Sequence, residues 1–129
     1  MRFPALFFGI GSASGAIAVA LGALAAHALR AELSASAIHA FETGVHYQFM
    51  HALALCAVAL WIRGAEPDAI LYPTIAAWSF VAGTVLFSGS LYALSLGGPR
   101  WLGPVTPIGG LALIFGWLVL AYGALRRAF

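Results

Sequence analysis

Apolar residues form four long runs separated by short polar connections, and this pattern predicts four helices. A helix needs about 20 apolar residues to cross the hydrocarbon core of a bilayer, and each run reaches that length. The helices are expected at about residues 3–29, 35–63, 68–96 and 107–127. The pattern therefore predicts an all-α integral membrane bundle of four transmembrane helices that forms a single transmembrane domain over residues 1–129.

Capping residues indicate where several of these helices begin and end. Ser34 can accept a hydrogen bond from the free amides of the first turn of the second helix. Gly64 suits the end of that helix, since glycine tolerates the backbone geometry found there. Thr106 and Pro107 form a typical cap and first-turn pair, so the fourth helix is expected to begin near Pro107.

The first apolar run has a feature of secretory signal peptides. Arg2 precedes it, and the triplet Ala26-His27-Ala28 resembles a small-residue cleavage site. The run is longer than the apolar part of a typical signal peptide, so an uncleaved membrane helix is expected.

Composition places the chain in a bilayer. It is 63% hydrophobic and 8% charged, with a mean hydropathy of +0.98, whereas soluble domains carry about a quarter charged residues. The net charge of +2 comes without a basic run interleaved with aromatic residues, so nucleic acid is not an expected partner. Cys56 is the only cysteine, which excludes an intramolecular disulfide and favours a small buried side chain.

Arginines near the ends of the runs predict the orientation, because cytoplasmic connections carry an excess of positive charge. One end of the bundle holds Arg2, Arg63, Arg126 and Arg127. The other end holds Arg30 and Arg100. Both termini are therefore expected in the cytoplasm, with the chain in a bacterial inner (plasma) membrane.

Glycines recur at steps of seven residues, which keeps them on one face of a helix. In lipid, helices associate where small residues let their backbones approach closely. The glycines expected in packing seams are Gly15, Gly22, Gly83, Gly97, Gly109, Gly116 and Gly123.

Polar side chains interrupt the second apolar run. Their burial in lipid costs free energy unless groups on neighbouring helices bond to them. Glu42 and His46 fall near the membrane boundary and are expected to form an interfacial rim. His51 lies about 12 Å deeper than Thr43, at about 1.5 Å per residue. The third helix runs the opposite way and brings its polar residues to similar depth. The expected intramembrane polar cluster is His27, Tyr47, Gln48, His51, Ser88, Ser90 and Tyr92.

Two interpretations of His51 remain open. It could be a neutral imidazole bonded to a serine, to Tyr47 or to a carbonyl on a facing helix, in which case it holds the bundle together. It could instead handle protons or a ligand, since ionisable groups within a membrane are often functional.

Metal and catalytic sites are weakly indicated. His39, Glu42 and His46 share one helix face, and His27 could add a fourth zinc ligand. The paired Glu-x-x-His motifs of di-iron bundles are missing, so no metal or cofactor is expected. The run Ser88-Gly89-Ser90 lacks the strand–turn–helix context of a nucleophile elbow, so an enzyme is not expected either.

Several segments together resemble a known family. They are GALAAHAL at residues 22–29, FETGVHYQ at 41–48, HAL at 51–53, FSGSLY at 87–92, PIGG at 107–110 and GW at 116–117. In residues and order they resemble a bacterial domain-of-unknown-function family (number 423) of small inner-membrane proteins with eukaryotic small transmembrane relatives. The resemblance implies four membrane helices and no established activity. Two positions depart from it: Ala25 stands where the family often has glycine, and His46 stands where it often has arginine or another polar residue.

Three hypotheses follow for the function. The first is a non-enzymatic accessory or scaffold protein for lipid, for a partner membrane protein or for a homo-oligomer. The alternative is a small oligomeric proton-coupled transporter or channel that uses His51. The second alternative is a membrane metalloprotein. A wet hollow that reaches His51 would favour transport.

Overall fold

The computed structural model describes residues 3–126 and confirms the all-α membrane architecture. Four helical segments are long and apolar enough to cross a membrane, and no strand occurs within the described residues. The long helices are α1 Phe3–Leu24, α3 Ala35–Gly64, α4 Leu71–Ser95 and α5 Val105–Leu125.

Short helical segments extend or connect the long ones. A π-helical turn, Ala25–Leu29, and the short helix α2, Arg30–Glu32, continue α1 without a break. The first helical segment is therefore a few residues longer than predicted. Two 3-10 turns, Pro67–Ala69 and Arg100–Leu102, precede α4 and α5.

The predicted start of α3 is confirmed, and the predicted start of α5 is wrong by two residues. The Ser34 hydroxyl accepts from the backbone amide of Ala37 across 3.2 Å. In α5 the N-cap is Pro104 and the helix begins at Val105. Thr106 thus lies inside the first turn, where its hydroxyl bonds to another helix and caps nothing. Arg127, at the predicted end of the last helix, lies outside the described residues.

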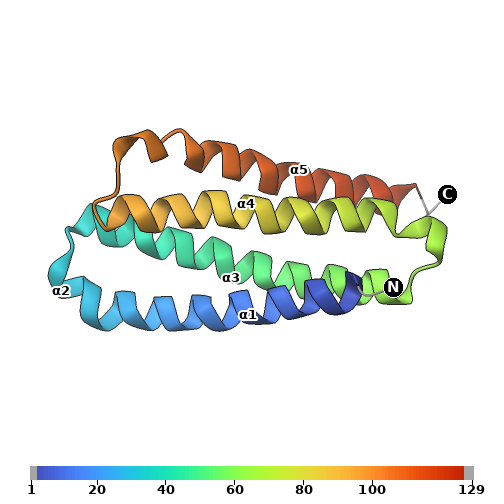
Figure 1. Cartoon of the computed structure of the whole chain (residues 1–129), viewed down its shortest axis with the longest axis horizontal. Coiled ribbons are helices and arrows are strands. Elements are labelled where there is room, and N and C mark those ends of the chain that lie inside the picture. Colours follow the sequence, from blue (N-terminus) through green and yellow to red (C-terminus); the bar gives the residue numbers. More distant parts are fainter. Residues whose placement is uncertain (1–2, 127–129) are drawn as a thin grey trace.

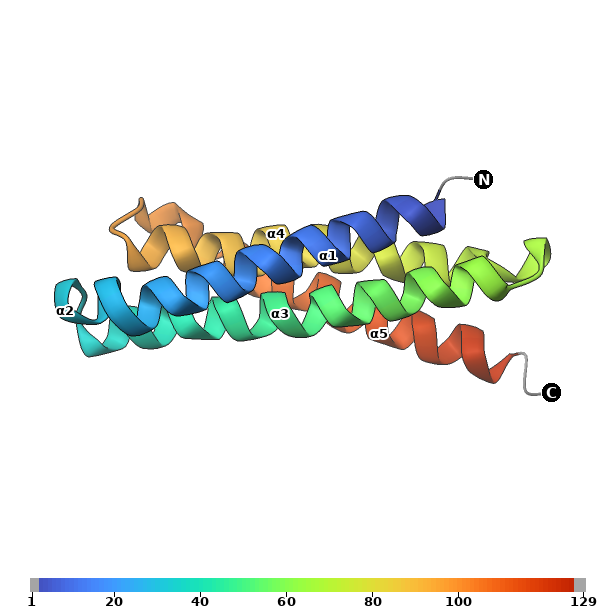
Figure 2. The same ribbon diagram turned by 90° about the horizontal axis from the view of Figure 1, so that it is seen from below.

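The long helices lie side by side in chain order. Figure 1 shows α1, α3, α4 and α5 in succession, and each packs against the one before it. The backbones of α1 and α4, and those of α3 and α5, approach less closely, and these pairs meet through side chains such as Phe7 and Trp78, whose ring centroids are 5.1 Å apart. Figure 2 shows that α1 begins and α5 ends at the same end of the bundle. This arrangement leaves seams between helices that are not chain neighbours.

Apolar packing is concentrated toward the end where the chain begins. Phe7 of α1 and Phe80 of α4 are fully buried, and both belong to a cluster with Leu55, Ala59 and other residues of α3. Large apolar side chains on the outer faces of all four helices stay exposed, as expected for surfaces that face lipid.

The seam between α4 and α5 depends on glycines that the seven-residue pattern singled out. A methyl group on Gly83 would lie 2.6 Å from Leu113, and one on Gly116 would lie 2.7 Å from Phe80. These distances are shorter than real carbon contacts, so the neighbouring atoms would have to move to admit a side chain at either glycine. The glycines of this seam are Gly83, Gly109, Gly116 and Gly123.

The first helix is packed less tightly at its expected glycines. A methyl group on Gly15 or Gly22 would meet its nearest neighbour at 3.8 Å or 3.4 Å, which an ordinary side chain tolerates. The close approach of α1 to α3 is instead at Gly11, where a methyl group would lie 2.7 Å from Cys56 Sγ.

Gly97 is not a packing glycine, contrary to the prediction. It has a φ of +89°, and a methyl group there would meet no atom within 4 Å. It follows the last residues of α4, and the amide of Gly98 bonds back to the carbonyl of Ala93 across 2.7 Å. Gly97 therefore ends the helix by adopting a left-handed conformation that other residues avoid.

Candidate functional site

Gln48 joins three helices through its side-chain amide. It lies on α3, is buried, and donates from Nε2 to the backbone carbonyl of Ser14 on α1 across 2.9 Å. Its Oε1 accepts from the hydroxyl of Tyr92 on α4 across 2.6 Å. One side chain on α3 thus holds both neighbours at once, which satisfies a buried amide that would otherwise be costly in lipid.

Tyr92 and Ser88 fasten α4 to a single turn of α3. The Tyr92 ring packs against Phe41, with ring centroids 4.9 Å apart. It also covers Gly44 so closely that a methyl group there would lie 2.7 Å from the ring. The Ser88 hydroxyl donates to the carbonyl of Gly44 across 2.7 Å. The absence of a side chain on Gly44 therefore makes this contact between α3 and α4 possible.

His51 is held by partners on both ring nitrogens. Nδ1 lies 2.8 Å from the backbone carbonyl of Tyr47, one turn earlier on α3. The indole N–H of Trp117 on α5 donates to Nε2 across 3.0 Å. A carbonyl only accepts and an indole N–H only donates, so both bonds are satisfied by a neutral imidazole with its hydrogen on Nδ1.

The expected partners of His51 are therefore only partly right. The Tyr47 partner is its backbone carbonyl, on the same helix as His51. The Tyr47 ring stacks nearly parallel to the imidazole, with centroids 6.2 Å apart. No serine bonds to His51 within the described residues, and Trp117 supplies the contact from another helix.

Ser90 connects α4 to α5 through the hydroxyl group of Thr106, which lies in the first turn of α5. Their hydroxyl oxygens are 2.6 Å apart, and Ser90 also bonds to the carbonyl of Phe87 at 2.9 Å. Since each hydroxyl has one hydrogen, Ser90 donates to Phe87 and accepts from Thr106.

We name the residues that make these contacts the polar layer. Their hydrogen bonds form four separate groups, which together link all four long helices. Ser14, Gln48 and Trp117 lie near the middle of their helices, whereas Ser90 lies toward the end of α4 and Thr106 lies in the first turn of α5. The members are Ser14, Gly44, Tyr47, Gln48, His51, Ser88, Ser90, Tyr92, Thr106 and Trp117.

His27 does not join the polar layer. It lies in the π-helical turn, is exposed, and makes no hydrogen bond within residues 3–126. Tyr47 is also partly exposed, since 38% of its surface remains accessible.

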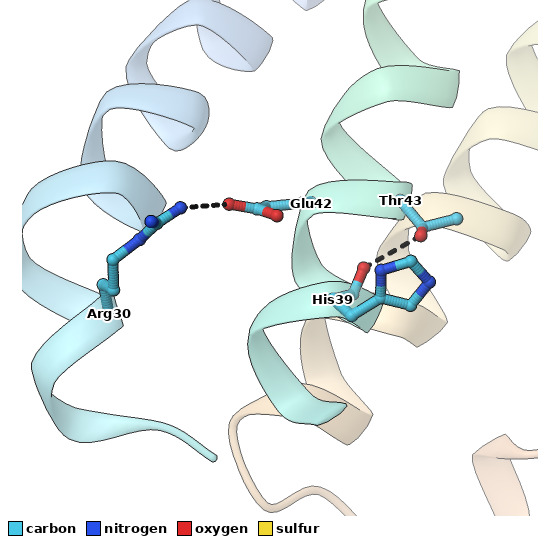
Figure 3. Close-up of polar contacts among 4 residues, drawn as sticks. All are labelled: Arg30, His39, Glu42 and Thr43. Atoms are coloured by element: carbon cyan, nitrogen blue, oxygen red, sulfur yellow. Dashed lines mark hydrogen bonds and ion pairs between the residues drawn. The ribbon is translucent and has the colours of Figure 1, made fainter. Parts of the chain in front are cut away.

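Glu42 and His46, the predicted interfacial rim, lie on α3, where His46 is exposed and Glu42 is partly exposed. Glu42 forms an ion pair with Arg30 at 3.2 Å (Figure 3), and the two side chains are 44% and 66% exposed, respectively. The same picture shows Thr43 bonded to the carbonyl of His39, a contact within α3. Exposed pairs of this kind contribute a few tenths of a kcal/mol.

No metal site is formed by the residues described. Within residues 3–126 no group of three His, Cys, Asp or Glu side chains is placed to hold an ion. Glu42, the carboxylate of the sequence-based candidate, is engaged by Arg30. The metalloprotein hypothesis therefore has no ligand set in this part of the chain.

A hollow of about 460 Å³ lies in the seam between α1 and α4. Gln48, His51 and Ser88 contribute to its wall, but most of the lining is apolar, including Ile17 and Val85. The hollow reaches His51, the residue that would handle protons in the transport hypothesis. The polar groups that line it from α3 are already bonded to protein.

Comparison with known proteins places the chain in a family. Residues 21–110 match the model of a family described as protein of unknown function (DUF423). That match covers more than half of the chain. The chain belongs to this family. The resemblance read from segments of all four expected helices is thereby confirmed.

Relatives in the family cover nearly the whole chain. The UPF0382 membrane protein YwdK of Bacillus subtilis is 38% identical over 94% of this chain and 97% of its own length. A UPF0382 membrane protein of Haemophilus influenzae is 42% identical over 88% of each chain. The UPF0382 inner membrane protein YgdD of Escherichia coli is 39% identical over 97% of this chain and 91% of its own length. No solved structure matches the chain. The names state a membrane location and give no activity.

Sequence reasoning missed several members of the polar layer. Trp117 stood in the segment GW but was treated as a family motif, and its reach to α3 depends on how the helices cross. Thr106 was assigned to a helix cap. Ser14 contributes only a carbonyl, for which a sequence carries no signal.

Proposed function

We propose that this protein is a non-enzymatic accessory or scaffold protein of the membrane. The observation that carries the proposal is that the buried side chains Gln48, His51, Ser88 and Ser90 all have protein hydrogen-bond partners. Both nitrogens of His51 and both ends of the Gln48 amide have protein partners. A catalytic or transport site needs groups that are free to meet a ligand, whereas this polar layer fixes helix register and rotation.

We propose that the hollow between α1 and α4 binds an apolar group. The hollow between α1 and α4 has a largely apolar wall in a chain built for a bilayer, so it suits a lipid acyl chain or a side chain from a partner membrane protein. A second copy of this chain is one such partner.

Replacement of His51 by leucine tests the proposal. His51→Leu removes two hydrogen bonds and is expected to lower the thermal unfolding temperature in detergent. Purified protein should contain no stoichiometric metal by elemental analysis. Proton flux into proteoliposomes should equal that of empty liposomes. A variant with unchanged stability and altered proton or solute flux would contradict the scaffold.

Proton-coupled transport is the second candidate, because the hollow reaches His51. It requires the bond from Trp117 to break during each cycle, so that the imidazole can take up a second proton. The same flux measurement decides between the two candidates: a pH-driven current lost in His51→Leu but kept in Trp117→Phe supports transport.

We further propose that both termini face the cytoplasm. Arg63 and Arg126 lie at the end where α1 begins, and Arg30 and Arg100 lie at the opposite end. Arg2 and Arg127, which complete the predicted asymmetry, lie outside the described residues. A fluorescent protein fused to the C-terminus should be bright, and an alkaline phosphatase fused there should be inactive. The reverse pattern would contradict this orientation.

A further inference from the structure

A second hollow, of about 520 Å³, lies where α1 begins and α3 ends. Its wall is formed by apolar residues of both helices, among them Phe8 and Leu60, and by the charged side chain of Arg63. It is separate from the polar layer, because no member of that layer lines it.

Gly9 is one of the residues that line this hollow. A methyl group on Gly9 would meet no atom within 4 Å, so helix packing does not explain the missing side chain. Gly9 is exposed and borders the hollow together with Phe8 and Ala59. An apolar recess of this kind on a membrane helix leaves room for a chain of methylene groups.

Arg63 supplies a charge at the mouth of the recess. It is exposed and makes no ion pair or hydrogen bond within residues 3–126. Arg126 at the same end differs, since it donates to the hydroxyl of Tyr72 across 3.0 Å. The carboxylates of Glu66 and Asp68 follow Arg63 in the turn, and neither pairs with it.

The position of Arg63 along α3 matches the membrane boundary. Glu42 and Arg63 are 21 residues apart, and this length corresponds to about 31 Å of helix, close to the thickness of the hydrocarbon core. The Arg30–Glu42 pair therefore marks one boundary, and Arg63 marks the other. A guanidinium at this level lies beside lipid phosphates, which it can bind through two hydrogen bonds.

We propose that the recess formed by Phe8, Gly9, Ala59, Leu60 and Arg63 binds an anionic phospholipid. The phosphate of the lipid pairs with Arg63, and one acyl chain fills the space beside Gly9. Basic positions between membrane helices recognise anionic head groups in this way. The inference is independent of the scaffold proposal, because it concerns neither His51 nor the seam between α1 and α4.

Native mass spectrometry of the detergent-solubilised full chain tests this lipid site. The protein is titrated with phosphatidylglycerol and, separately, with phosphatidylcholine, and the bound fraction is measured for the wild type and three variants. The wild type is expected to prefer phosphatidylglycerol. Arg63→Gln should reduce that preference about fivefold, the effect of one arginine near a membrane surface.

Two further variants separate the parts of the site. Gly9→Leu adds a side chain to the wall of the recess, where a methyl group would meet no protein atom within 4 Å, and should weaken binding of both lipids. Arg126→Gln is the matched control at the same end, and it should leave both affinities unchanged. Equal losses in Arg63→Gln and Arg126→Gln, or no headgroup preference in the wild type, would overturn the proposal. Circular dichroism of each variant verifies that the helices are intact.

Discussion

The indole N–H of Trp117 donates to Nε2 of His51 across 3.0 Å and so joins α5 to α3, two long helices that do not follow one another in the chain. The imidazole can accept the bond because its other nitrogen donates to the carbonyl of Tyr47. The contact sets the rotation of α5 and leaves His51 in its neutral form.

A double-mutant cycle should show that His51 and Trp117 are coupled. Trp117→Phe keeps an aromatic ring and removes the donor, and His51→Leu removes the acceptor. Hydrogen bonds between membrane helices contribute about 0.6 kcal/mol on average, so a coupling of that order is expected in the free energy of unfolding. Equilibrium unfolding in mixed micelles measures it. Strictly additive effects would show that the bond does not stabilise the fold.

Gln48→Leu should destabilise the protein more than Tyr92→Phe. The leucine variant loses both bonds of the amide and leaves the Tyr92 hydroxyl without its acceptor, whereas Tyr92→Phe keeps the bond to Ser14. We expect a cost of about 1–2 kcal/mol for Gln48→Leu and about half of that for Tyr92→Phe. Thermal unfolding in the same detergent compares them. If Tyr92→Phe proved the more damaging change, the bridging role of Gln48 would be refuted.

Adjacent glycines in α5 provide a test of helix packing. A methyl group on Gly109 would collide with the backbone of Phe87, whereas one on Gly110 would meet the Phe87 ring at an ordinary 3.6 Å. Gly109→Ala is therefore expected to cost about 1–3 kcal/mol in the free energy of unfolding. Gly110→Ala should have a small effect of either sign. Similar unfolding temperatures for the two variants would mean that α4 and α5 can move apart at Gly109 without loss of stability.

Removal of the histidines on the exposed face of α3 should leave the protein unchanged. His39 and His46 are exposed, and Glu42 pairs with Arg30. The double variant His39→Ala and His46→Ala is expected to unfold within about 0.5 kcal/mol of the wild type. Addition of zinc should not raise the unfolding temperature of either protein. A zinc-dependent increase that is lost in the double variant would revive the metalloprotein hypothesis.

The sequence by itself determined the fold class and the number of membrane helices. Runs of about 20 apolar residues have few alternatives to a spanning helix, because backbone groups in lipid must be satisfied within the segment. It also indicated Gln48, His51, Ser88, Ser90 and Tyr92 as polar groups at similar depth, since depth follows from counting residues along a helix.

Only the tertiary structure decided which of these groups meet. Rotation of each helix about its axis is set by contacts between distant residues, so Trp117 could not be assigned to His51 from spacing, and His27 could not be separated from the cluster. The role of Gly97 was likewise a question of backbone conformation, since a glycine that ends a helix and one that packs in a seam look alike in sequence. The depth of a residue in the bilayer depends on its position along one helix, whereas its hydrogen-bond partners depend on how several helices pack together.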